Sequence, residues 1–270
     1  MAEPKLGVIH YNFPDMTWEQ FLDFCTRTGY EYVEVAIGDV WGPDEDSPEQ
    51  KARQVRRQLD DAGLRASALS AGNDFVLEDE AAIAPQVERM QRICCQLAPA
   101  LGTRVVRTEG GRPKDEVPPQ RYAQAIAGCL RRCVPFIEPE GTLLAVDNHG
   151  PVTNDAELQL QIFELAGSQN VGANLDTMNY RWAGHDLETI DRFYELIAPH
   201  VFHTHLKDGT GSRENYRGAA LGEGEIHLQH AIDCLRRAGY DGVWCAEYEG
   251  PEREAGRGYA KCYQWMKANL

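Results

Sequence analysis

The most constraining feature of the sequence is a repeated pattern: an amphipathic helix, then a glycine or turn, then a short β-rich segment. The β-rich segments begin on average about 34 residues apart, which is the length of one strand–helix unit. Eight of them can be identified, at 5–11, 29–37, 63–71, 102–108, 141–149, 170–176, 200–206 and 240–248. Alternation of this kind predicts parallel strands with helices packed on their outer side.

A chain of 270 residues with eight such units favours a single (β/α)8 TIM barrel, one α/β domain covering residues 1–270. A doubly wound open sheet is the alternative fold. That fold usually carries a glycine-rich phosphate-binding turn after its first strand, and HYNFPDM at 10–16 is not such a turn. The barrel is therefore the preferred interpretation.

The net charge of the chain limits the classes of partner that it is expected to bind. Lys and Arg number 27 against 42 Asp and Glu, which gives a net charge of −15. Nucleic acids are bound mainly through Lys and Arg, so we expect a small-molecule partner and no nucleic acid, with a homo-oligomer left open.

No apolar run approaches the ~18–20 residues of a membrane span, and the N-terminus lacks the pattern of a secretory signal. We therefore expect a cytoplasmic protein whose eight cysteines are free thiols, since no CxxC pair is present.

Two of the eight histidines alternate in the seventh β-rich segment, VFHTHLKD. In a strand, alternate residues share a face, so His203, His205 and Lys207 lie together and Phe202 lies opposite. Unpaired polar groups are costly to bury, by roughly 2–7 kcal/mol each. The polar face therefore needs a polar partner.

The ends of the last four strands supply that partner. Counting faces places Asp147, Asp176, His205 and Glu247 at the carboxyl ends of the strands, where the active sites of such barrels lie. Three converging carboxylates repel one another unless a cation lies between them. We therefore predict a metal site made by these four residues, with Mn²⁺ first and Mg²⁺, Co²⁺ or Zn²⁺ as alternatives. His203, one step deeper, is predicted to support the ligand or face the substrate.

Several motifs also resemble a known family. The segments LAVDNHG, NLDTMN, HTHLKD, LGEGEI and CAEYEG are similar to those of the xylose isomerase-like TIM barrels grouped as sugar phosphate isomerases and epimerases. The resemblance implies the same four metal ligands. It departs at the fifth strand, where the family usually has Glu-Asn-His and this chain has Asp147-Asn148-His149. Aspartate is shorter by one methylene, on the order of 1.5 Å, so it has less reach towards a substrate.

The resemblance further implies a keto-sugar isomerase or epimerase that abstracts a proton next to a carbonyl through a metal-bound enediolate. Glu247 or Asp147 would remove the proton, and Lys207 would stabilise the enolate. His149 could take over acid–base work if Asp147 falls short. The residues predicted to bind substrate come from strand ends and from the glycine-rich loop at 209–224: His10, Asn73, Arg107, His149, His203 and Arg213. Glu34, at the end of the second strand, is predicted to line the same pocket.

Three other activities compete with this interpretation. The same metal site could serve a dehydratase or lyase acting on a keto-inositol or a 3-keto-glycoside. An endonuclease IV-like nuclease is disfavoured, because the third and fourth strands end in Ser70-Ala71 and Arg107-Thr108, without the additional histidines of that enzyme. A non-catalytic, metal-bearing subunit of a larger enzyme is the remaining alternative.

Overall fold

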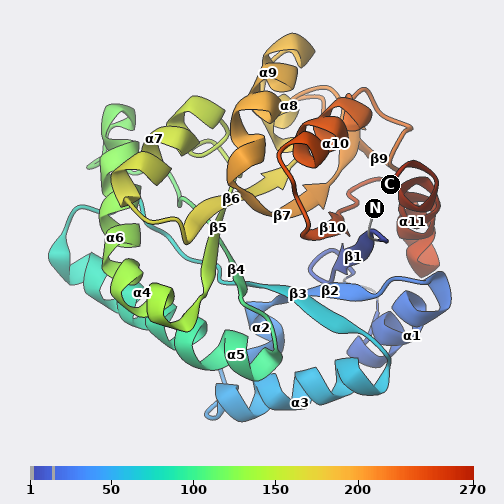
Figure 1. Cartoon of the computed structure of the whole chain (residues 1–270), viewed down its shortest axis with the longest axis horizontal. Coiled ribbons are helices and arrows are strands. Elements are labelled where there is room, and N and C mark those ends of the chain that lie inside the picture. The colour runs from blue at the N-terminus through green and yellow to red at the C-terminus, as the bar shows by residue number, and fades with distance from the viewer. Residues whose placement is uncertain (1–2, 14–15) are drawn as a thin grey trace.

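Eight parallel strands close into a barrel, and helices surround it (Figure 1). The structure is a computed structural model that describes residues 3–13 and 16–270. The order around the barrel is β1-β10-β7-β6-β5-β4-β3-β2, which confirms the predicted (β/α)8 fold. The barrel strands are β1 (Lys5–Ile9), β2 (Tyr32–Ala36), β3 (Arg65–Ser70), β4 (Val105–Thr108), β5 (Leu143–Asp147), β6 (Val171–Asp176), β7 (Val201–Leu206) and β10 (Val243–Ala246).

The outer layer consists of one principal helix after each strand. These helices are α1 (Trp18–Thr28), α3 (Pro48–Asp61), α4 (Glu80–Arg92), α6 (Tyr122–Glu140), α7 (Ala156–Ala166), α9 (Leu187–Ile197), α10 (Leu228–Arg237) and α11 (Arg257–Asn269). Shorter elements are α2 (Ile37–Val40), α5 (Ala98–Leu101) and α8 (Asn179–Ala183), the π-helical turn η1 (Ile93–Leu97), and the 3-10 turns η2 (Pro119–Arg121), η3 (Ala198–His200) and η4 (Glu254–Gly256). Among the described residues, none of the helices has the length and apolar character needed to cross a membrane.

Local signals explain where the principal helices begin and end. The Thr17 hydroxyl accepts a hydrogen bond from the backbone N–H of Gln20, and the Gln20 side chain accepts one from Thr17 N–H, which together cap α1. Asp155 and Asp186 are the N-cap residues of α7 and α9, and each side chain accepts a hydrogen bond from a backbone N–H in the first turn of its helix. Gly29 ends α1 with a positive φ of 105°, a conformation that favours glycine.

Strand register brings the predicted site residues to one mouth of the barrel. Asp176 on β6 lies opposite His205 on β7, and His205 lies opposite Cys245 on β10. Asp147 on β5 pairs with Asn174 on β6. Parallel strands end at the same edge, so these polar side chains meet at the carboxyl ends while apolar side chains fill the space between strands and helices.

A hairpin interrupts the chain between β7 and α10. Its strands, β8 (Asp208–Thr210) and β9 (Arg217–Ala219), are antiparallel. The buried Asp208 carboxylate accepts hydrogen bonds from four backbone N–H groups, those of residues 209, 222, 224 and 226. A Cβ at Gly224 would lie 2.0 Å from Asp208 Oδ1, so glycine is required for this approach. The base of the predicted glycine-rich loop is therefore held by one side chain.

Asp208→Ala is expected to lower the free energy of unfolding by about 3 kcal/mol, because it leaves four backbone N–H groups at the loop base without their acceptor. Asp208→Asn, which keeps one carbonyl oxygen, should lose roughly half as much. Glu214→Ala, at an exposed position of the same loop, is the matched control and should change stability by less than about 0.5 kcal/mol. Urea-induced unfolding measures all three, and equal stability of Asp208→Ala and the wild type would contradict the role given to Asp208.

Candidate active site and metal centre

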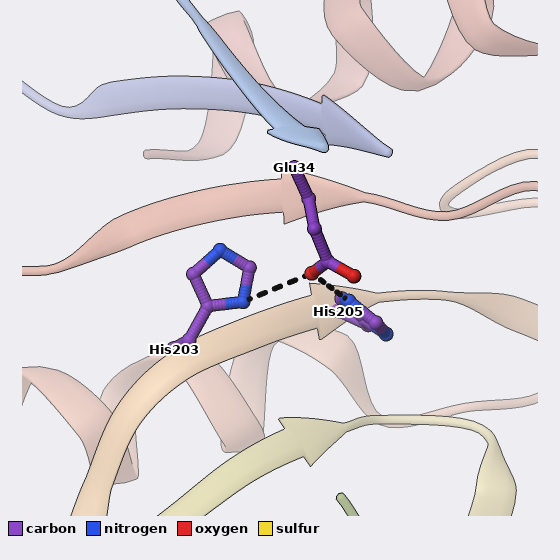
Figure 2. A group of neighbouring side chains, drawn as sticks. All are labelled: Glu34, His203 and His205. Atoms are coloured by element: carbon purple, nitrogen blue, oxygen red, sulfur yellow. Dashed lines mark hydrogen bonds and ion pairs between the residues drawn. The ribbon is translucent and has the colours of Figure 1, made fainter. Parts of the chain in front are cut away.

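The two histidines of β7 both face the barrel interior, and both lie next to Glu34 from β2 (Figure 2). Glu34 Oε2 is 2.7 Å from His205 Nε2 and 3.5 Å from His203 Nδ1. All three side chains are buried. The polar partner required by the alternating histidines is thus, in part, a carboxylate from a strand that does not neighbour β7 in the barrel.

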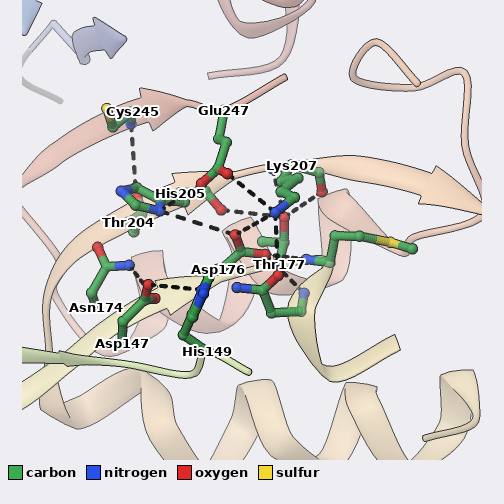
Figure 3. A network of polar contacts seen from close by, with 12 residues as sticks. Asp147, His149, Asn174, Asp176, Thr177, Thr204, His205, Lys207, Cys245 and Glu247 are labelled. Atoms are coloured by element: carbon green, nitrogen blue, oxygen red, sulfur yellow. Dashed lines mark hydrogen bonds and ion pairs between the residues drawn. The ribbon is translucent and has the colours of Figure 1, made fainter. Parts of the chain in front are cut away.

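A second group lies on the other side of His205. Asp176, His205 and Glu247 each offer a ligand atom, and these atoms lie within 4.8 Å of one another (Figure 3). His205 Nδ1 is 2.9 Å from Glu247 Oε2 and 4.0 Å from Asp176 Oδ2. We call these three residues the Asp–His–Glu group. The structure therefore brings together three of the four predicted metal ligands.

The Asp–His–Glu group has the properties expected of a cation site. Asp176 Oδ1 accepts hydrogen bonds from the backbone N–H groups of Met178 and Asn179, at 2.8 Å each. Its Oδ2 and His205 Nδ1 are buried and form no well-aligned hydrogen bond among the described residues, although Lys207 Nζ lies 3.5 Å from the first and Glu247 Oε2 lies 2.9 Å from the second. Unsatisfied buried polar atoms are costly, and two carboxylates with one imidazole suit Mn²⁺, Mg²⁺, Co²⁺ or Zn²⁺. The residues present thus fit a divalent cation.

Lys207 balances the charge of this group. Its Nζ lies 3.2 Å from Glu247 Oε1, 3.1 Å from Glu249 Oε2 and 3.5 Å from Asp176 Oδ2. Burial alone would lower the lysine pKa, but these carboxylates hold it well above its usual value. Lys207 is therefore a fixed cation, which suits electrostatic stabilisation and not proton removal.

The carboxylates of the group differ in their electrostatic surroundings. Burial raises the pKa of Asp176 to about 7, and the charges of Glu247 and Asp147 add to this, while Lys207 opposes it. Burial would also raise the pKa of Glu247, but Lys207 and His205 override it and hold that pKa well below its usual value. Glu247 is consequently ionised.

Asp147, the fourth predicted ligand, lies outside the Asp–His–Glu group. Its Oδ2 accepts a hydrogen bond from Arg107 Nη1 at 2.9 Å, and its Oδ1 accepts one from Asn174 Nδ2 at 2.7 Å. The structure thus departs from the expected four-ligand set, because an arginine and an amide engage both oxygens. The feature of the sequence that pointed to this difference was the aspartate at position 147, which is shorter than the glutamate usual in the family.

A cavity of about 570 Å³ opens above the group, at the carboxyl ends of the strands. Its lining includes several predicted site residues, namely His10, Arg107, Asp147, His149, His205 and Glu247. His10 Nδ1 lies 2.9 Å from Asp39 Oδ2. The His149 side chain is 54% exposed, with its Nδ1 3.8 Å from Asp147 Oδ2, so it can reach a ligand in the cavity.

Three residues predicted to bind substrate do not line this cavity. Asn73 uses both ends of its amide on the backbone of Glu109, which ties the loops after β3 and β4 together. Arg213 is exposed, and its guanidinium lies 4.8 Å from the centre of the Trp182 ring. Both side chains make loop contacts away from the cavity in this structure, and their binding of substrate stays a prediction.

His203 is the third predicted substrate-binding residue that does not line the substrate cavity. It lines a different cavity, of about 420 Å³, with residues such as Lys5 and Val201 that begin strands. Its Nδ1 lies 2.9 Å from Asn174 Oδ1 and its Nε2 lies 3.1 Å from Ser67 Oγ. Burial lowers its pKa to about 4, although the Glu34 charge opposes this. His203 is therefore a neutral, hydrogen-bonded core residue that does not face the substrate cavity.

Sequence reasoning missed three contributors to the site. The Asn174 amide contacts both Asp147 and His203. Asn174 lies two residues before Asp176, so the alternation that places Asp176 on the inner face of the strand places Asn174 there as well. Asn12 donates to Glu247 Oε1 at 3.2 Å, and no local pattern marked it. Asp39, from α2, pairs with His10.

Comparison with known proteins places the chain among similar barrels. A model of the xylose isomerase-like TIM barrel family matches residues 22–269. Among curated proteins, an uncharacterised protein of Methanocaldococcus jannaschii is 26% identical over 118 residues, a match that covers 42% of this chain and 39% of that protein. The chain thus spans about two fifths of the length of the curated relative it matches.

Solved structures share the whole barrel. An IolI protein with a bound zinc atom has a TM-score of 0.81 and 18% identity, covering 98% of this chain and 97% of that one. An L-ribulose 3-epimerase has a TM-score of 0.75 and 17% identity, and the match covers 98% of this chain and 94% of that one. The probable 3-DHS dehydratase AsbF of Bacillus anthracis has a TM-score of 0.75 and 16% identity, covering 97% and 98%. At such identities the likeness shows a common fold.

Proposed function

Because the chain belongs to the xylose isomerase-like TIM barrel family, we propose that it is a divalent-metal-dependent enzyme that isomerises or epimerises a keto-sugar. The Asp–His–Glu group carries this proposal, since its three ligand atoms converge and two of its buried polar atoms form no well-aligned hydrogen bond among the described residues. Mn²⁺ is our first candidate. Mg²⁺, Co²⁺ and Zn²⁺ remain alternatives, and similar barrels have been solved with zinc or magnesium.

The charge of the cavity favours an uncharged substrate. Five carboxylate residues line it: Asp39, Glu109, Asp147, Glu247 and Glu249. Within the described parts of the chain, Arg107 is the only lysine or arginine in that lining. Its guanidinium is already shared between Glu34, Asp147 and Ser70. A sugar phosphate would meet more negative than positive charge here, so we propose a neutral keto-sugar or cyclitol as substrate.

The residues of this chain can perform the proton transfer. When bound, the cation would polarise a substrate carbonyl and acidify the neighbouring C–H. Glu247 is ionised and lines the cavity, and Lys207 and Asn12 hold its Oε1 in place. Glu247 would remove the proton, while the Lys207 cation balances the charge that develops nearby. Return of the proton to the adjacent carbon isomerises the sugar, and return to the opposite face epimerises it.

A dehydratase acting on a keto-inositol or 3-keto-glycoside is the second candidate. The contacts of Asp147 favour it, because Arg107 and Asn174 occupy both carboxylate oxygens. Glu247 is then the carboxylate of the Asp–His–Glu group that remains for proton removal. In elimination of a β-hydroxyl, one such base can remove the C–H proton and return it to the departing oxygen, which leaves as water, whereas epimerisation needs a proton donor on the second face. His149 is the cavity residue available for that second role.

Incubation in D₂O with neutral ketoses, keto-inositols, 3-keto-glycosides and their phosphate esters tests the proposal. We expect deuterium uptake at the carbon next to the carbonyl, with kcat/KM at least about tenfold higher for a neutral substrate than for its phosphate ester. A product with the same molecular formula as the substrate indicates an isomerase or epimerase, and a product that has lost one water molecule indicates the dehydratase. Absence of exchange with every substrate and metal would overturn the proton chemistry, and preference for a phosphate ester would overturn the substrate class.

A further inference from the structure

We propose that Glu34 is a positioning residue for the metal centre, which holds the His205 ring so that Nδ1 faces Asp176 and Glu247. The inference rests on the proposed function, because it assumes that the Asp–His–Glu group binds a cation. Glu34 lies on β2 and His205 on β7, two strands separated by β1 and β10 in the barrel. The contact therefore crosses the barrel interior (Figure 2).

The geometry gives Glu34 a defined action on the imidazole. Glu34 Oε2 is 2.7 Å from His205 Nε2, and both side chains are at most 3% exposed. An imidazole that binds a metal is neutral, with one N–H and one lone pair. With the N–H on Nε2 donated to Glu34, the lone pair is on Nδ1, the atom that faces the other two ligand residues. Carboxylates that accept this second N–H commonly orient metal-binding histidines.

Glu34 is itself held on its other oxygen. Its Oε1 accepts a hydrogen bond from Arg107 Nε at 2.8 Å. Arg107 also donates to Ser70 Oγ at 2.8 Å and to Asp147 Oδ2 at 2.9 Å. The carboxylate is thus held in place on both oxygens.

Glu34, His203 and His205 also lie close enough to hold a metal themselves. Their hydrogen bonds argue against that role. His203 Nδ1 and Nε2 are engaged by Asn174 and Ser67, and both Glu34 oxygens accept hydrogen bonds. This group is satisfied without a cation. In the Asp–His–Glu group, Asp176 Oδ2 and His205 Nδ1 form no well-aligned hydrogen bond among the described residues.

Co²⁺ titration of the full chain against a competing chelator tests the proposal. Glu34→Gln is nearly isosteric and keeps the fold, but its amide is a weaker, uncharged acceptor for the His205 N–H. We expect Co²⁺ affinity to fall by about tenfold or more. Ser67→Ala is the matched control, because it removes a hydrogen bond from His203 and leaves His205 untouched. Its Co²⁺ affinity should stay within about threefold of the wild type.

Proton NMR of the Co²⁺-loaded protein gives a readout that does not depend on activity. We expect one paramagnetically shifted, slowly exchanging ring N–H in the wild type, from His205 Nε2, and its displacement or loss in Glu34→Gln. Wild-type Co²⁺ affinity in folded Glu34→Gln would overturn the inference, and so would rapid exchange of that N–H in the wild type. Failure of the wild type to bind Co²⁺ would instead overturn the proposed function.

Discussion

Replacing Glu247 by glutamine is expected to lower kcat by about a thousandfold, because an amide cannot accept the proton that the reaction removes. The substitution keeps the volume of the side chain and one of its two oxygens, of which Oε2 faces His205 and Oε1 faces Lys207. The fold should therefore persist, and metal affinity should fall far less than turnover. Steady-state kinetics with the substrate found in the D₂O experiment measures the change.

Glu225→Gln is the matched control for this substitution. Glu225 is another partly buried, ion-paired carboxylate, which accepts hydrogen bonds from Arg181 Nε at 2.6 Å and Gly211 N–H at 2.9 Å, outside the cavity lining. Its kcat should stay within a few-fold of the wild type. If Glu247→Gln retains near-normal kcat, Glu247 is not the base, and His149 becomes the residue to test.

Removal of the metal is expected to abolish activity, and Mn²⁺ or Co²⁺ should restore it. The loss follows because the remaining side chains would have to acidify the substrate C–H without the cation. Stability should change as well, since a cation that binds only the folded chain stabilises it by about 2.7 kcal/mol at 100 times its Kd. For a chain of this size we expect a rise in Tm of roughly 5–10 °C on adding metal. Activity unaffected by prolonged chelation would contradict the metal-dependent mechanism.

The barrel could be predicted because its signals are local and repeated. Each strand–helix unit has its own apolar pattern and turn, so eight of them define the topology before any long-range contact is considered. The carboxyl ends of parallel strands must meet at one edge, and this was enough to group Asp176, His205 and Glu247. Asp208 follows the same strand as His205, and its carboxylate accepts hydrogen bonds from four backbone N–H groups of the loop that comes after it.

The rest of the site depends on contacts between strands that are distant in the sequence. Arg107 lies 73 residues from Glu34 and 40 from Asp147, and its guanidinium joins the two carboxylates. Strand-face counting places these residues near one another but does not say which pairs form. The direction of each side chain depends on its partners, which is why Asp147 was expected among the ligands, and why Arg213 was expected at the substrate and not beside Trp182.

The central claim is that Asp176, His205 and Glu247 together hold one divalent cation. The most direct test is the metal content of the dialysed protein after loading with Mn²⁺ or Co²⁺, measured by mass spectrometry against protein concentration. We predict one equivalent per chain for the wild type and less than about a tenth for the folded Asp176→Ala/His205→Ala double variant. One equivalent retained by the double variant, or none bound by the wild type, would contradict the account.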